Sequence, residues 1–103
     1  MDSYKKLQKC VGFQWDQHNT EKNWQKHKVT PVECEEVFFN KPLVVTDDLK
    51  HSSSEKRFYV LGKTDLSRKL FIVFTIRKEL IRVISARNMN KKEKRSYDQY
   101  EKK

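Results

Sequence analysis

At 103 residues the chain is the size of one domain, and its charged and hydrophobic residues each make up 36%. These proportions predict a small core beneath a heavily ionised surface. Lysine and arginine outnumber aspartate and glutamate by 23 to 14, and the net charge of +9 favours a polyanionic partner such as nucleic acid or an acidic protein. The longest apolar run, residues 70–76, is far too short to span a bilayer, so we expect no membrane partner.

The cysteines and histidines do not form a recognisable site. Cys10 and Cys34 lack CxxC spacing and no secretory signal precedes them, so we expect free thiols in a cytoplasmic protein. No combination of cysteine and histidine has zinc-ligand spacing, and no glycine-rich phosphate loop is present. We therefore expect neither a metal nor a cofactor.

The N-terminal part of the chain begins without a clear hydrophobic period. We interpret residues 1–9 as a flexible basic leader that precedes a single domain over residues 10–103. Val11, Phe13 and Trp15 then alternate with small or polar residues, which predicts a short strand with one apolar face.

Two helices are predicted next. Asp16 can cap a first helix over residues 17–27, because its carboxylate can accept hydrogen bonds from the unpaired amides of the first turn. Residues 30–33 (TPVE) combine a threonine cap, a proline at the first position and a glutamate that closes a capping box, so a second helix begins there and ends near Asn40 and Pro42. The inward side of the first helix is expected to carry Thr20, Trp24 and His27.

The central part of the sequence predicts four consecutive strands. Residues 43–46 and 57–63 are rich in β-branched and aromatic types. The run 70–76 is typical of a strand covered on both faces, and after the short polar break at 77–79 a second run over 80–87 predicts an antiparallel hairpin. A final helix should begin after the cap at Asn90 and reach about Lys102, with Tyr97 on its inner face. The order indicates an α+β domain with a mostly antiparallel sheet, built from a four-strand meander and an N-terminal strand, with two N-terminal helices and one C-terminal helix.

Three arginines on the hairpin are the main clue to function: Arg77, Arg82 and Arg87. Regular alternation places Arg82 on one face of the strand and Arg87 on the other. A guanidinium stays charged and can bind two phosphate oxygens at once, so the three together indicate an anion site. The alternative is that each one pairs with a carboxylate or reaches water at a sheet edge.

Two side chains are candidates for proton transfer. Glu55 alternates onto the same side as Arg57, where it could act as a general base or could form an ordinary surface ion pair. Histidine is the residue type best suited to proton transfer at neutral pH, so His27 is a candidate, but it also suits a packed position at the C-terminus of its helix.

The last helix has an unusual charge order. Basic residues crowd its N-terminal end and Asp98 and Glu101 lie toward its C-terminal end, and the helix dipole opposes both placements. This pattern supports a phosphate-contacting cluster, with a solvated charge run as the alternative. The basic residues are Lys91, Lys92, Lys94 and Arg95.

Several short motifs, in this order, resemble the BrnT toxin family. The similarity covers about residues 12–100, and the strand 81–87 (IRVISAR) is its most specific part. The family usually has glycine after the histidine, where this chain has Lys28. The matching segments are 13–16 (FQWD), 26–27, 33–39, 55–58 (EKRF), 61–62, 81–87, Glu93 and Tyr97.

This resemblance implies a RelE-like fold and a ribonuclease that stops translation, the toxin of a type II toxin–antitoxin pair. It also implies a BrnA-like antitoxin with a ribbon-helix-helix part, in a 2:2 complex that binds operator DNA and represses its own operon. Together with the basic sheet, the resemblance suggests RNA cleavage without a metal.

On this interpretation each candidate residue has a role. Arg57, Arg82 and Arg87 stabilise developing charge, and Glu55 or His27 transfers the proton. The RNA backbone is held by Lys22, Lys26, Arg77, Lys91, Lys92 and Arg95. Two other interpretations remain open: a basic module that binds RNA or the ribosome without catalysis, and a protein whose positive surface mainly receives an acidic, antitoxin-like chain.

Overall fold

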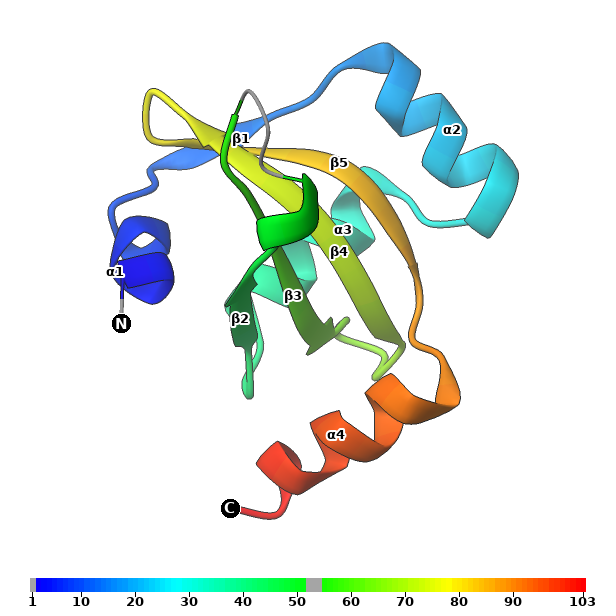
Figure 1. Cartoon of the computed structure of the whole chain (residues 1–103). Helices are drawn as coiled ribbons and strands as arrows, with labels where there is room; N and C mark the ends of the chain where they lie inside the picture. Colours follow the sequence, from blue (N-terminus) through cyan, green and yellow to red (C-terminus); the bar gives the residue numbers. More distant parts are fainter. Residues whose placement is uncertain (1, 52–54) are drawn as a thin grey trace.

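The structure is a computed structural model that describes residues 2–51 and 55–103. Its centre is a five-stranded sheet in the order β1-β5-β4-β3-β2 (Figure 1). The strands are β1 (Gly12–Gln14), β2 (Val44–Asp47), β3 (Arg57–Lys63), β4 (Lys69–Arg77) and β5 (Leu80–Asn88).

The sheet is mixed. Strands β2 to β5 pair consecutively and antiparallel, and the hairpin predicted from the short polar break joins β4 to β5. Strand β1 returns from the N-terminal part of the chain and pairs in parallel with β5. The α+β class expected from the sequence is therefore confirmed.

The described residues form four α-helices around the sheet, and one of them was not expected. They are α1 (Asp2–Gln8), α2 (Gln17–His27), α3 (Pro31–Phe39) and α4 (Lys91–Glu101), with a short 3-10 turn, η1, at Leu49–His51. The expectation of two N-terminal helices is wrong, because α1 forms within the segment interpreted as a leader. Its Leu7, and Cys10 just after it, pack against the core, so apolar anchoring outweighs the weak hydrophobic period of this segment.

The capping residues expected from the sequence begin three of these helices. The side chain of Asp16 accepts a hydrogen bond from the backbone N–H of Asn19 at 2.7 Å. Thr30 with Glu33, and Asn90 with Glu93, form complete capping boxes. These signals are local in the sequence, and each one fixes the residue at which its helix starts.

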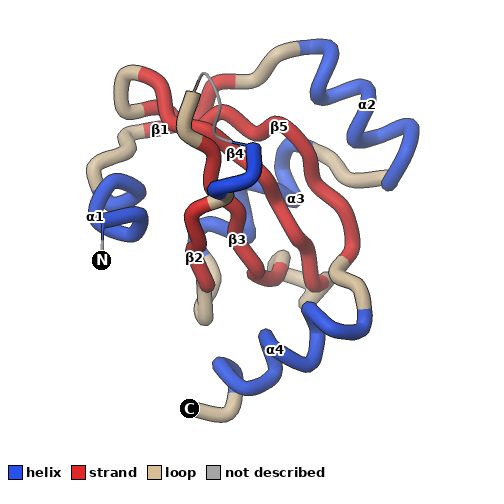
Figure 2. The backbone as a smooth tube through the Cα atoms, in the orientation of Figure 1, coloured by secondary structure: helices blue, strands red, loops and turns tan. Residues whose placement is uncertain are grey.

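The core lies on one face of the sheet, which α3 covers (Figure 2). Cys34 and Val37 of α3 are fully buried against the inward side chains of β3, β4 and β5, including Phe58 and Phe74. Gly62 allows this close approach, because a Cβ atom there would lie 2.6 Å from Cγ1 of Val37.

The opposite face is covered only at one end. There α4 places the buried Tyr97 against a second cluster with Leu61 and Met89, and Tyr97 donates a hydrogen bond to the carbonyl oxygen of Pro42 at 2.6 Å. Phe71 packs against this cluster but remains partly exposed, and so does Val73 farther along the strand. The expectation that β4 is covered on both faces is therefore wrong for the middle of the strand.

Helix α2 packs along the edge of β5 through a polar residue. Asn23 is buried, and its side-chain oxygen accepts the backbone N–H of Ala86 at 3.2 Å. The inward stripe expected from the sequence is wrong, because Trp24 is 48% exposed and His27 is also exposed. An edge strand carries backbone N–H groups that no neighbouring strand pairs, and the side chain of Asn23 accepts a hydrogen bond from one of them.

Within residues 2–51 and 55–103, no helix is both long and apolar enough to cross a membrane.

Candidate nucleic-acid interface

A β-bulge in β5 determines which side chains share the open face of the sheet. Val73 of β4 pairs with Ser85 and the next residue, Phe74, pairs with Val83, so Ile84 is the extra residue. Beyond this bulge the alternation of β5 is reversed. Arg82 pairs with Thr75 and Arg87 with Phe71, and both arginines therefore lie on the face opposite α3. The expectation that Arg82 and Arg87 lie on opposite faces is wrong.

The same register adds Arg57 to this face. Arg57 of β3 pairs with Thr75, and Thr75 pairs with Arg82, so the three residues form one row across the sheet. We call it the arginine row. Neighbouring strands are about 4.8 Å apart, which separates the Cα atoms of Arg57 and Arg82 by about 10 Å across β4. The threonine between them is buried and small, and its hydroxyl donates to the carbonyl oxygen of Lys56 at 2.9 Å. Both arginines remain partly exposed above it.

Arg82 keeps much of its hydrogen-bonding capacity. Its Nη2 lies 2.6 Å from Oδ2 of Asp16, the residue that caps α2. Its Nε and Nη1 make no hydrogen bond to another described residue. The pKa of Asp16 is lowered by the backbone N–H of Asn19 and by Arg82, so Asp16 is ionised at neutral pH and holds Arg82 in place.

Glu55 faces Arg77 rather than Arg57. Nε and Nη2 of Arg77 donate to the two carboxylate oxygens of Glu55 at 2.7 and 2.9 Å. These bonds lower the pKa of Glu55, and the nearby charge of Arg82 lowers it further. Glu55 is therefore an ionised acceptor close to the arginine row, and Arg77 has a carboxylate partner in addition to any phosphate.

Arg87 has a different environment. Nη1 and Nη2 of Arg87 donate to the two oxygens of Glu93 at 2.8 and 2.9 Å, and its guanidinium lies 4.2 Å from the centre of the Phe71 ring. Partial burial raises the pKa of Glu93, but the hydrogen bonds from Arg87 and from the backbone of Asn90 outweigh it and lower the pKa overall. Because Glu93 also closes the capping box of α4, Arg87 ties this helix to the sheet.

His27 lies far from Glu55. It ends α2, and Asp16, which binds Arg82, begins the helix. An 11-residue helix is about 16 Å long. The C-terminal end of α2 is held instead by Arg68, whose guanidinium donates to the backbone carbonyl of His27 at 2.9 Å. The structure therefore separates the two candidate proton-transfer groups. Lys28 keeps the left-handed conformation that glycine would favour, with φ of 54°.

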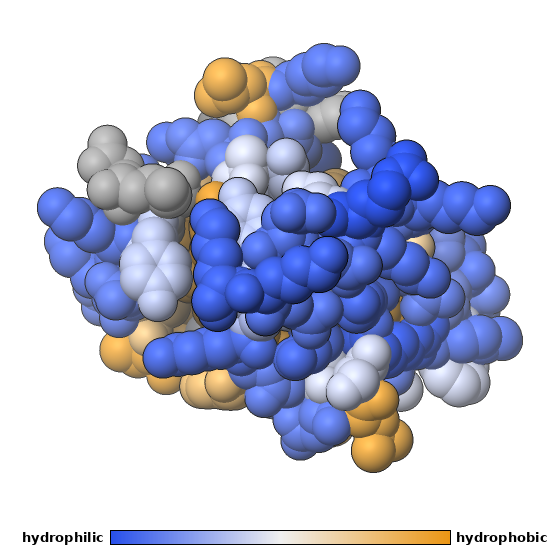
Figure 3. All heavy atoms as spheres, turned by 90° about the horizontal axis from the view of Figure 1, so that it is seen from below, coloured by the Kyte–Doolittle hydropathy of each residue, from blue (hydrophilic) through white to orange (hydrophobic). Residues whose placement is uncertain are grey.

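The basic residues expected to contact RNA are at the surface. Exposed lysines and an arginine cover the first turns of α4, and seen from that side the centre of the molecule is hydrophilic, with apolar atoms at its margins (Figure 3). The acidic end of α4 is used differently: Asp98 lies 2.8 Å from Nζ of Lys69, and Glu101 lies 3.0 Å from Nζ of Lys63. Tertiary ion pairs thus account for the acids that oppose the helix dipole. Among the described residues, no ion pair involves Lys22, Lys26, Lys91, Lys92 or Arg95.

Three residues of this surface were not singled out as site residues by sequence reasoning. Asp16 was expected only as a helix cap, and its pairing with Arg82 spans 66 positions. Tyr59 and Ser85 lie on the row next to the arginine row, on either side of Val73, and the ring of Tyr59 stacks on Phe71 at 5.1 Å. Alternation could have placed Tyr59 beside Arg57, but nothing in the sequence signals the bulge that turns Ser85 to this face.

The thiols are unlike those of a reactive site. Burial raises the pKa of Cys34 to about 12, and burial also raises that of Cys10. Both cysteines are free. In the parts of the chain that the structure describes, no three histidine, cysteine or acidic side chains are grouped as a metal site would require.

Comparison with known proteins adds one finding. A family model described as "Ribonuclease toxin, BrnT, of type II toxin-antitoxin system" matches residues 15–93, which is more than half of the chain. A comparison with curated proteins gives no match. The matched segment contains every strand of the sheet except β1, and it includes the whole arginine row.

Proposed function

Because the chain belongs to the BrnT family of ribonuclease toxins of type II toxin–antitoxin systems, we propose that it cleaves RNA on the arginine row without a metal ion. The observation that carries this proposal is the bulge of β5, which brings Arg82 onto the same face as Arg57. Two guanidiniums on either side of a small threonine form a cradle for one phosphodiester group, and their charges oppose the negative charge that develops on it.

The reaction requires few groups. The 2′-hydroxyl of the RNA attacks the adjacent phosphorus, a cyclic phosphate forms, and the bond to the 5′-oxygen breaks. The proton of the hydroxyl passes to a carboxylate oxygen of Glu55, and the leaving oxygen takes a proton from water. Glu55 suits this role by position, because it lies two residues before Arg57 and is ionised at neutral pH.

Other basic residues have supporting roles in this proposal. Arg87 lies about 13 Å from the arginine row along β4, at 3.3 Å per residue, so it contacts a neighbouring phosphate rather than the reacting one. His27 belongs to the same distant end. The remaining RNA backbone is held by Lys22, Lys26, Arg77, Lys91, Lys92 and Arg95, whose contribution falls as salt rises.

We further propose that the protein acts in the cytoplasm to stop translation and growth. A BrnA-like antitoxin with a ribbon-helix-helix part would neutralise it in a 2:2 complex that binds operator DNA. A RelE-like arrangement of the sheet is part of this proposal. The family description supports the existence of an antitoxin, and the net charge of +9 supports an acidic one.

A second function is favoured by one observation. Both oxygens of Glu55 already accept hydrogen bonds from Arg77, and its pKa is lowered, so it is a weak base. A basic module that binds RNA or the ribosome without cleaving it needs no base. This alternative predicts binding without new RNA 5′ ends.

Cleavage of a defined RNA by the purified protein, with EDTA throughout, separates the two functions. We expect cleavage by the unmodified protein and a loss of about 10²- to 10³-fold in Arg82→Ala, the effect of removing one charge-stabilising donor. Lys41→Ala is the matched control, because it removes one positive charge at an exposed position before β2. Salt-sensitive binding without cleavage would support the second function instead.

A further inference from the structure

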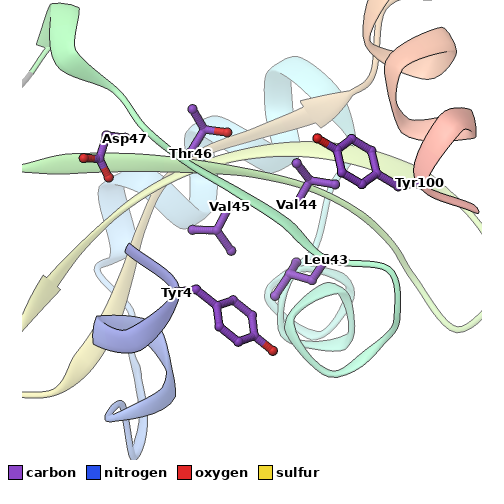
Figure 4. A pocket seen from close by; sticks show the side chains of 7 residues that line it. All are labelled: Tyr4, Leu43, Val44, Val45, Thr46, Asp47 and Tyr100. Atoms are coloured by element: carbon purple, nitrogen blue, oxygen red, sulfur yellow. The ribbon is translucent and has the colours of Figure 1, made fainter. Parts of the chain in front are cut away.

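Strand β2 forms one edge of the sheet, and a pocket of about 520 Å³ lies along it (Figure 4). Alternate residues of the strand face its two sides: Val44 and Thr46 lie toward Tyr100 of α4, and Val45 lies toward Tyr4 of α1. The pocket therefore extends over both sides of the strand edge, with Tyr4 on one side and Tyr100 on the other. It is lined mainly by Tyr4, Leu43, Val44, Val45, Thr46 and Tyr100.

The hydrogen-bond register leaves the backbone of Val45 directed outward. The N–H of Asp48 donates to the carbonyl oxygen of Arg57 at 2.9 Å, so these two form a hydrogen-bonded pair. In an antiparallel ladder such pairs alternate with non-bonded ones. Thr46 and Val44 therefore face β3, and the N–H and C=O of Val45, between them, face away from the sheet. Neither group bonds to another described backbone group.

The surroundings of this edge are positively charged. Exposed lysines lie within three positions of residues that line the pocket, on α1, on both sides of β2 and at the end of α4. Of the acids in these stretches, Asp47 pairs with Lys56 at 3.4 Å and Glu101 pairs with Lys63 at 3.0 Å. The lysines are Lys5, Lys6, Lys41, Lys50, Lys102 and Lys103.

We infer that the edge of β2 binds an extended acidic segment of the antitoxin, which adds a strand to the sheet beside Val45. The backbone of the segment completes the ladder, and its apolar side chains fill the pocket between Tyr4 and Tyr100. The acidic residues of the segment form ion pairs with the surrounding lysines. This inference rests on the proposed toxin–antitoxin function, and it adds a docking surface at the far edge of the sheet from α2.

Hydrogen exchange of the antitoxin-bound and free protein tests the inference at one residue. We expect the amide of Val45 to exchange rapidly in the free toxin and at least tenfold more slowly in the complex. The amides of Val44 and Thr46 already pair with β3 and serve as internal references. A Val45 amide that exchanges equally in a complex verified by gel filtration would overturn the inference. Slow exchange in the free toxin that disappears on dilution would assign the edge to a second copy of the chain.

A substitution provides an independent test. Val45→Pro removes the outward N–H without removing a bond of the β2–β3 ladder, as proline on an edge strand can. We expect its affinity for the antitoxin to fall at least tenfold, while Val45→Thr, which retains the N–H, stays within about twofold. RNA cleavage by the free variants should be unchanged. Equal affinity of folded Val45→Pro would contradict the docking surface, whereas a failure of the unmodified toxin to cleave RNA would count only against the proposed function.

Discussion

The two ends of the open sheet face carry the same residue type in different settings. At one end Arg82 makes a single-nitrogen contact with Asp16 and remains partly exposed above Thr75. At the other end Arg87 binds Glu93 through two nitrogens and lies against Phe71, beside α4. An arginine that is held in place but keeps donors available suits a ligand, whereas one with a two-nitrogen carboxylate partner suits a scaffold.

The difference shows that an arginine's role depends on the partners supplied by distant parts of the chain. Asp16 and Glu93 are both helix-capping residues, and each connects its helix to an arginine of β5. The caps therefore fix α2 and α4 at opposite ends of the same strand. The arginine row lies at the end that α4 leaves open.

The largest expected effect is a difference in RNA cleavage between variants that lack Arg82 and variants that lack Arg87. Arg82→Ala should lower the rate of RNA cleavage about 10²- to 10³-fold, because it removes charge stabilisation at the reacting phosphate, and the loss of its contact with Asp16 should reduce the free energy of unfolding by at most about 1 kcal/mol. Arg87→Ala should lower the rate less than about tenfold and reduce the free energy of unfolding by about 1 kcal/mol, because it loosens α4. Single-turnover cleavage and urea unfolding measure the two quantities, and equal losses of activity would remove the distinction between the ends.

The attachment of α4 can be weakened without touching either arginine. Burial raises the pKa of Tyr97 to about 12, so its hydroxyl remains a donor to the carbonyl oxygen of Pro42. Tyr97→Phe should reduce the free energy of unfolding by about 1 kcal/mol, the usual cost of one lost hydrogen bond. Cleavage should remain close to that of the unmodified protein. A large loss of activity in a folded Tyr97→Phe would show that the α4 end takes part in the reaction.

A stabilising change is expected at the end of α2. Lys28 adopts φ of 54°, where a non-glycine residue costs roughly 1–2 kcal/mol. Lys28→Gly should therefore raise the free energy of unfolding by up to about 1 kcal/mol, reduced by loss of the lysine contact 5.0 Å above the Trp24 ring. Thermal unfolding checks this, with Lys26→Gly, inside the same helix, as a control that should destabilise.

The smallest expected effect is a loss of thermal stability at acidic pH. Hydrogen bonds from lysines lower the pKa of Asp98 and of Glu101, and the pKa of Glu93 is also lowered. A lowered folded-state pKa stabilises the protein above the ordinary carboxyl pKa and loses this stabilisation as pH falls through the folded-state value. The melting temperature should therefore fall between about pH 5 and pH 3. Glu93→Gln should show a smaller fall, and an identical pH profile would argue against a stabilising role for its pair with Arg87.

Much of the fold could be predicted from the sequence because its signals are local. The capping boxes at Thr30 and Asn90 and the hairpin between β4 and β5 depend on neighbouring residues, and they are found where expected. Helix α1 was missed because it is stabilised by apolar contacts of Leu7 with the distant core rather than by a hydrophobic period.

The site was less predictable. Arg57 and Arg82 were identified as candidates, but alternation alone put Arg82 and Arg87 on different faces. The bulge at Ile84 arises from the pairing of β5 with β4. No glycine or other local sequence signal marks its position, so it could not be predicted from the sequence of β5 alone. The carboxylate partners of Arg77, Arg82 and Arg87 also come from outside the β4–β5 hairpin, so spacing along the hairpin could not reveal which arginine remains available.

The most direct measurement is of the arginine side chains themselves. The ¹⁵N signals of their Nε–H groups can be followed by NMR while a 2′-O-methyl RNA, which cannot be cleaved, is added in EDTA. We expect the signals of Arg57 and Arg82 to shift together and most strongly, with Arg87 shifting less. A titration in which Arg57 and Arg82 do not respond while Arg87 and Arg95 do would contradict it, because the phosphate would then bind at the α4 end of the sheet.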